Sequence, residues 1–178
     1  MRSANALRRT FLSRSAGYCA GVKLGFLLVL AFAAALLPAA SAGADDRSLR
    51  DAGRSRDAQF KRLGDKTRRT YRAWHRTGHA TRLARRLLRL NRRTRGELVL
   101  VRRALRGEEP STDGGATYRR LMFRSLRAFD LALVWDARGV RAFMRGRRVA
   151  ANRAWRRHGR YFDRSLRLTN RAIRAIEG

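Results

Sequence analysis

The chain has 178 residues, and its 43 basic and 13 acidic residues give a formal net charge of +30 at pH 7. Because 44% of its residues are hydrophobic, the chain is not simply a disordered basic tail, and its length fits one domain with its own core. Only three of the basic residues are lysines, so arginine carries nearly all of the positive charge and favours an anionic partner.

Residues 1–42 have the order of a secretory signal peptide. Five basic residues precede an apolar run over residues 24–37, Pro38 ends the run, and Ala40-Ser41-Ala42 offers small residues at the spacing of a cleavage site. The run is shorter than the ~20 residues of a membrane span. We therefore expect cleavage and a periplasmic or extracellular product. The alternative is an uncleaved signal that anchors the protein in the cytoplasmic membrane.

The export route and the true start of translation stay open. The segment Arg8-Arg9-Thr10-Phe11-Leu12 resembles the twin-arginine export motif. A start near residue 22 would instead leave a compact signal for the general secretory route. Cys19 is the only cysteine and lies within the leader, so the mature chain would have neither disulfides nor thiolate metal sites.

After the leader, we expect a polar N-terminal arm at residues 43–57 that starts frayed, and a helical bundle domain at residues 58–178. The arm mixes aspartates with arginines. From Phe60 onward, apolar residues recur at helical spacing, and this pattern changes phase at Gly78. A straight helix through Gly78 would bury arginines or expose leucines, so we predict a break near Gly78-His79.

The remaining elements are two further long helices and the loops before them. Residues 107–115 combine glycine, proline and three acids in the clearest loop of the chain, and the helical phase shifts again near Gly146. Leu98–Val101 resembles a strand but has no partner strand, so we assign it to the end of a helix. The sequence thus predicts an all-α fold, an antiparallel bundle of four helices at residues 58–77, 80–106, 116–145 and 149–176.

Arginines repeat at helical spacing on the second and fourth predicted helices, opposite the apolar face of each. On the fourth helix they fall within an arc of roughly 100°. We predict that these two stripes bind anions. The stripe of the second predicted helix consists of Arg82, Arg85, Arg86, Arg89, Arg92 and Arg93, and that of the fourth consists of Arg153, Arg156, Arg157, Arg160, Arg164, Arg167, Arg171 and Arg174.

Two interpretations of the stripes compete. In the first, they form a cationic surface that binds an anionic envelope polymer, anionic lipid or extracellular nucleic acid without reading sequence. Most aromatic residues fall on the apolar faces, which argues against base stacking by a single-strand binder. In the second, the protein is a structural or partner-binding helical protein, and GC-rich coding has placed arginine where other genomes use lysine and glutamate.

No residue pattern points to catalysis, a cofactor or a metal site. His75 and His79 are four residues apart, but the arginines around them would repel a cation, and we expect no metal there. His158 is expected in the core or at its boundary. Asp136 falls on an apolar helix face, so we expect it to be paired structurally, with an arginine of another helix as the suggested partner. The expected protein is therefore exported and non-enzymatic, and its oligomeric state is open.

Overall fold

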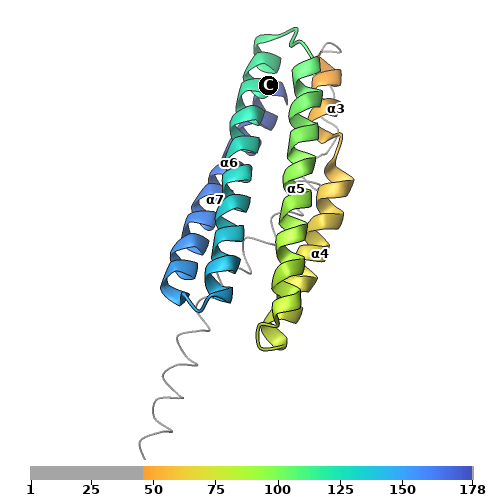
Figure 1. Ribbon diagram of the computed structural model, residues 1–178. Coiled ribbons are helices and arrows are strands. Elements are labelled where there is room, and N and C mark those ends of the chain that lie inside the picture. The colour runs from red at the N-terminus through yellow and green to blue at the C-terminus, as the bar shows by residue number, and fades with distance from the viewer. Residues whose placement is uncertain (1–45, 178) are drawn as a thin grey trace, which may run out of the picture.

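The computed structural model describes residues 46–177, which form five helices and no strand (Figure 1). The expected signal peptide and residues 43–45 of the expected arm lie outside this part. The helices are α3 (Arg47–Arg54), α4 (Asp57–Arg76), α5 (Thr81–Gly107), α6 (Asp113–Met144) and α7 (Arg148–Glu177). The four long helices pack into an antiparallel bundle, which confirms the predicted fold class.

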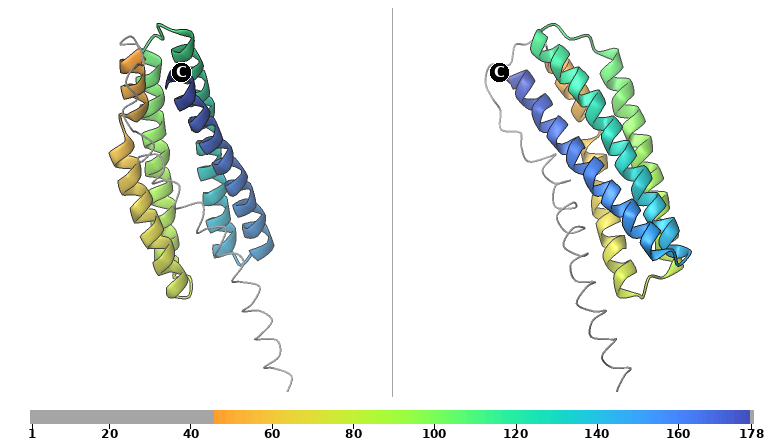
Figure 2. Two further views of the ribbon diagram at one scale, coloured as in Figure 1. Left: turned by 180° about the vertical axis from the view of Figure 1, so that it is seen from behind. Right: turned by 90° about the vertical axis from the view of Figure 1, so that its left-hand side faces the viewer.

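The bundle consists of two helical hairpins, α4 with α5 and α6 with α7, which lie side by side (Figure 2). Contacts between α5 and α6 join the hairpins, while the packing between α6 and α7 is the most extensive. Small residues allow this close approach, and Ala132, Ala151 and Ala172 are fully buried. Buried hydroxyls add polar links between the two helices. The Ser125 hydroxyl lies 2.9 Å from the Ser165 carbonyl oxygen and 2.7 Å from the Thr169 hydroxyl.

Both predicted phase changes are tight turns between helices. Gly78 and His79 have φ values of 61° and 70°, and the His79 N–H donates to the Trp74 carbonyl at 2.8 Å. Gly146 has φ 71° in the turn between α6 and α7. Glycine adopts this left-handed conformation without the penalty that a side chain causes. The break at Gly78 and the shift at Gly146 are therefore confirmed.

The expectation of a frayed polar arm is wrong for residues 46–54, because they contain helix α3. Leu49 is 0% exposed and Ala52 is 8% exposed, and both belong to the core cluster that also contains Leu98 and Leu105 of α5. Two apolar residues three positions apart are enough to attach this short helix to α5. The many charged residues around them concealed the pattern at the sequence level.

Asp46 ties the beginning of α3 to the loop between α5 and α6. Its carboxylate accepts hydrogen bonds from the Ser111 N–H at 3.0 Å and from the Thr112 hydroxyl. Burial works to raise the pKa of Asp46, but the hydrogen bonds from Thr112 and Ser111 hold this pKa below its usual value. The Thr112 hydroxyl also accepts the Gly115 N–H at 2.9 Å, so α6 begins at Asp113 and not at the expected residue 116.

Candidate functional site

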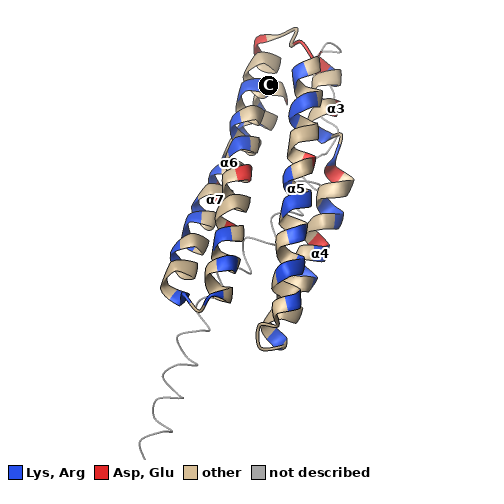
Figure 3. Cartoon of the chain, in the orientation of Figure 1, with Lys and Arg blue, Asp and Glu red and all other residues tan. Residues whose placement is uncertain are grey.

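The arginine stripes lie on the outer faces of α5 and α7, and all fourteen side chains are exposed. The opposite face of α5 buries residues such as Ala84 and Leu87, and that of α7 buries residues such as Ala154 and Leu168. Both stripes therefore lie on the exposed face of their helix, as the periodicity of the sequence predicted. Figure 3 shows basic positions along both helices and few acidic ones.

Acidic side chains in the described part of the chain do not neutralise the stripe arginines. Within residues 46–177, the ion pairs are Arg56–Glu97 at 2.6 Å, Arg95–Asp130 at 2.7 Å, Arg119–Glu109 at 3.2 Å, and Arg68–Asp65. None of the fourteen stripe arginines forms an ion pair with another residue of this described part. Their charge is therefore open to solvent and to an external anion.

The two stripes do not form one binding groove. Helix α5 packs mainly against α4, α6 and α3, whereas α7 packs mainly against α6. The stripes consequently belong to helices that are not neighbours in the bundle, and each faces away from the core. The structure provides two separate cationic surfaces, each elongated along one helix.

Trp135 is an aromatic residue beside the α7 stripe that the sequence analysis did not single out. The guanidinium carbon of Arg157 lies 4.4 Å from the centroid of its ring, and that of Arg138 lies 4.5 Å from it. Such cation–π contacts hold both arginine side chains in position. The i, i+3 spacing of Trp135 and Arg138 was visible in the sequence, but the contribution of Arg157 from α7 required the tertiary structure.

The two histidines near the α4–α5 turn form part of an aromatic cluster. The ring centroids of His75 and His79 are 5.2 Å apart, and His79 packs edge-on against Trp74 with centroids 4.9 Å apart. Burial lowers the pKa of both histidines, and for His79 the nearby His75 and Arg148 lower it further. Within the described residues, no group of three histidine, cysteine, aspartate or glutamate side chains could hold a metal ion.

Asp136 is paired structurally, as expected, but the suggested arginine partner is wrong. Its carboxylate accepts hydrogen bonds from the Tyr71 hydroxyl at 2.6 Å and from the Asn91 amide at 3.2 Å. Burial, with the charge of Asp136 as the second cause, raises the pKa of Tyr71 well above its usual value. His158 is half-buried, as expected, and its Nδ1 lies 3.0 Å from the Ala132 carbonyl oxygen.

An apolar cavity separates the two hairpins in the middle of the bundle. The centre of a water-sized sphere can occupy about 100 Å³ of it, and residues of α4, α5, α6 and α7 line its walls. Asp136 and Asn91 are among its polar lining residues. No periodicity in the sequence could reveal this cavity, because it depends on how far apart two hairpins settle. Its main apolar walls are formed by Phe60, Leu98, Leu126, Phe129, Leu133 and Phe162.

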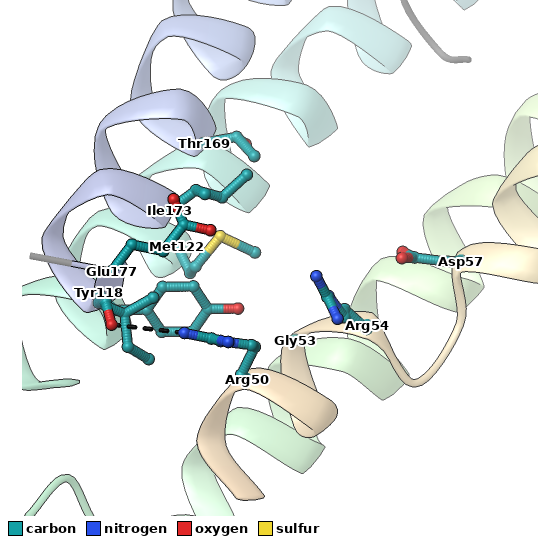
Figure 4. Close-up of a pocket in the computed structure, with 10 residues that line it drawn as sticks. Arg50, Gly53, Arg54, Asp57, Tyr118, Met122, Thr169, Ile173 and Glu177 are labelled. Carbon is teal, nitrogen blue, oxygen red and sulfur yellow. Dashed lines mark hydrogen bonds between the residues drawn. The ribbon is translucent and has the colours of Figure 1, made fainter. Parts of the chain in front are cut away.

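A smaller hollow of about 30 Å³ adjoins this cavity and shares Gly53 and Met122 with it. Figure 4 shows Arg50 and Arg54 of α3 on one side of the hollow, across from residues of α6 and α7. The Arg50 guanidinium donates a long hydrogen bond of 3.4 Å to the Ile176 carbonyl. These two arginines lie in the expected polar arm and were not among the predicted site residues.

Asp57 also lines the hollow, and it makes the stability of the protein depend on pH. Burial raises its pKa to about 6, although Arg54 lowers it somewhat. The folded state then binds a proton more readily than the unfolded state, so this contribution to stability is present below pH 3.8 and is lost as pH rises through 6. We expect the free energy of unfolding of Asp57→Asn, relative to wild type, to rise by about 1 kcal/mol from pH 4 to pH 7 after allowance for solvent screening.

Chemical denaturation of both proteins at the two pH values measures this difference. Asp51→Asn, which replaces an exposed carboxylate on α3, is the matched control. If the free energies of unfolding of Asp57→Asn and the wild type differed by the same amount at pH 4 and pH 7, this would contradict the raised pKa of Asp57.

Comparison with protein-family models, with curated proteins and with solved structures finds no match to this chain. Among the described residues, no helix is long and apolar enough to cross a membrane.

Proposed function

We propose that this protein binds anionic polymers or surfaces in the cell envelope through the arginine stripes of α5 and α7, without catalysing a reaction. The observation that carries the proposal is that fourteen exposed arginines form no ion pair within the described part of the chain. Ordinary surface helices intersperse both signs of charge, and the stretch of α5 from Thr81 to Gly96 contains no acid at all.

The shape of each stripe suits a linear polyanion or a charged surface better than a small anion. The α5 stripe extends from Arg82 to Arg93 and the α7 stripe from Arg153 to Arg174, so their arginines can each contact a different phosphate, sulfate or carboxylate group. Each exposed contact contributes little, and the sum gives an affinity that depends on salt and ignores sequence. The location in the envelope rests on the signal peptide expected at residues 1–42.

Binding to three polyanions of different chemistry tests the proposal. At about 0.15 M salt, we expect the protein to bind heparin, double-stranded DNA and phosphatidylglycerol-containing vesicles, with dissociation constants of about 1–100 µM for DNA. Dextran and phosphatidylcholine vesicles, which carry no net charge, are the controls and should not bind. The proposal would be overturned if the protein bound none of the three polyanions.

A further inference from the structure

The turns between α4 and α5 and between α6 and α7 lie together at one end of the bundle (Figure 1). The His79 ring of the first turn packs against Phe143 near the end of α6, with ring centroids 4.6 Å apart, and Trp74 packs edge-on against Phe143 at 5.1 Å. These aromatic contacts join the two hairpins where they turn. Residues 75–82 and 141–149 together form one surface, the turn end of the bundle.

Two exposed apolar side chains flank the α6–α7 turn. Met144, the last residue of α6, is 40% exposed, and Val149, the second residue of α7, is 71% exposed. Within the described residues, Val149 is the most exposed of the large hydrophobic residues. Apolar surface gains free energy when it leaves water, so both side chains favour a partner that offers an apolar environment at this turn.

The α6–α7 turn is also strongly cationic. Arg145, Arg147 and Arg148 are exposed between the two apolar residues, and none of them forms an ion pair within the described part of the chain. The guanidinium carbon of Arg148 lies 4.7 Å from the centroid of the Phe143 ring. The sequence contains no acid from residue 137 to residue 162. The turn therefore combines unneutralised cations with exposed apolar surface.

Both arginine stripes begin at the turn end. The α5 stripe starts at Arg82, directly after the α4–α5 turn, and the sequence contains no acid from residue 66 to residue 96. The α7 stripe starts at Arg153, about one helical turn beyond Val149. The stripes lie on helices that are not neighbours, yet the first arginines of both would approach a flat anionic surface that meets the turn end.

The opposite end of the bundle attracts an anionic surface less strongly. The loop between α5 and α6 contains Glu108 and Glu109, and Asp113 begins α6. Glu109 and Asp113 are exposed, and the Asp46 carboxylate is held against the same loop. Figure 3 shows acidic positions at this end of the bundle and none at the two turns. This uneven charge orients the bundle with its turn end toward an anionic surface.

Apolar side chains among arginines match the chemistry of an anionic bilayer. At a bilayer surface, arginines contact lipid phosphates, while apolar side chains enter the boundary between head groups and acyl chains. A hydrophilic polyanion such as heparin or DNA would pair with the arginines but would leave Met144 and Val149 in water. The two apolar residues therefore favour a bilayer among the anionic ligands of the proposed function.

We propose that the turn end docks on an anionic lipid bilayer. Met144 and Val149 insert at the boundary between head groups and acyl chains, and Arg145, Arg147 and Arg148 contact lipid phosphates. This inference rests on the proposed function, which supplies the attraction to anionic surfaces, and it specifies both the surface and the point of contact. The bundle then has its turn end on the bilayer, and the α5–α6 loop faces away from it.

A fluorescent label at position 149 tests where the protein meets the bilayer. Val149→Cys is prepared in the 178-residue chain together with Cys19→Ser, which removes the only natural thiol, and is labelled with the environment-sensitive fluorophore NBD. Vesicles that contain phosphatidylglycerol should raise the emission and shift it to the blue, and vesicles of phosphatidylcholine alone should not. Val99→Cys in the same background is the matched control, because Val99 on α5 is 53% exposed and should give no response.

Three results of this labelling experiment would overturn the inference. They are a silent label at position 149, an equal response at positions 149 and 99, and an equal response to the two kinds of vesicle. The first would leave the turn in water, and the second would place the α5 face as close to the bilayer as the turn. The third would show that lipid charge does not select the surface.

Paired substitutions measure the contribution of the apolar residues. Met144→Gln combined with Val149→Gln keeps the net charge and should weaken co-sedimentation with phosphatidylglycerol vesicles at least about fivefold. Val99→Gln combined with Leu100→Gln is the matched control, because these α5 residues are 53% and 41% exposed, and it should change vesicle binding less than about twofold. Circular dichroism checks that both variants fold. Equal vesicle binding by the two variants would overturn the inference.

Heparin binding separates a failure of this inference from a failure of the proposed function. The variant with Met144→Gln and Val149→Gln should bind heparin within about twofold of the wild type, because it keeps every arginine. An equal loss of heparin and vesicle binding in this variant would overturn the inference, because insertion into lipid would not be its cause. A silent label with intact heparin binding would overturn the inference alone, whereas a wild type that binds neither heparin, DNA nor vesicles would overturn both.

Discussion

Gly139→Ala is expected to lower the free energy of unfolding by about 2 kcal/mol or more. A Cβ atom at this position of α6 would lie 2.6 Å from Cδ1 of the Trp155 ring and closer still to its Nε1, far inside van der Waals contact. The ring cannot easily retreat, because Phe143 and Trp74 pack against it with centroids 5.8 Å and 6.4 Å away. The substitution therefore forces α6 and α7 apart in the most extensively packed pair of helices.

Gly159→Ala in α7 is the matched control. A Cβ atom at this position meets nothing within 4 Å, so the substitution should leave stability unchanged or raise it by up to about 1 kcal/mol through the better helix propensity of alanine. Urea denaturation of both variants and the wild type measures the difference. Equal stability of the two variants would contradict the close packing of Gly139 against Trp155.

The C-terminal ends of the helices could be predicted from this sequence because its arginine faces make the helical phase easy to follow. The predicted helix ends at residues 77, 106, 145 and 176 each lie within one residue of the observed ends. The phase changes at Gly78 and Gly146 marked the turns, since a continuous helix through either would have placed arginines in the core. Amphipathic periodicity and two left-handed glycines thus determine most of the topology.

Features that depend on contacts between helices could not be predicted. The attachment of α3 depends on one leucine and one alanine that fit against α5. The partners of Asp136 are Tyr71 on α4 and Asn91 on α5, and nothing local to α6 points to either. The interhelical cavity depends on the separation of two hairpins, which periodicity does not describe. The arginine stripes, in contrast, followed from periodicity alone because a solvent-exposed face needs no partner.

Replacing the six arginines of the α5 stripe with glutamine is expected to weaken heparin binding at about 0.15 M salt at least about tenfold. Each substitution removes one exposed cation and keeps a residue with good helix propensity, so the melting temperature should change little. The reason for the loss is that these side chains have no acidic partner within residues 46–177 and are free to contact an external anion.

A charge-matched comparison separates the stripe from the overall field of the protein. Substituting Arg85, Arg89 and Arg92 with glutamine lowers the net charge by the same amount as substituting three arginines that form ion pairs, Arg68, Arg95 and Arg119. The first set should weaken heparin binding clearly more than the second. Equal losses would contradict the assignment of binding to the α5 stripe and would favour the view that its arginines reflect coding bias.

The salt dependence of DNA binding by the wild-type protein tests the central proposal most directly. If a stripe engages four to six phosphates, a plot of the logarithm of the binding constant against the logarithm of the salt concentration should fall with a slope of about −4 to −5. The substituted α5 stripe should make this slope shallower. A slope near zero, or the absence of measurable binding even at about 0.05 M salt, would contradict the proposal that the stripes bind polyanions.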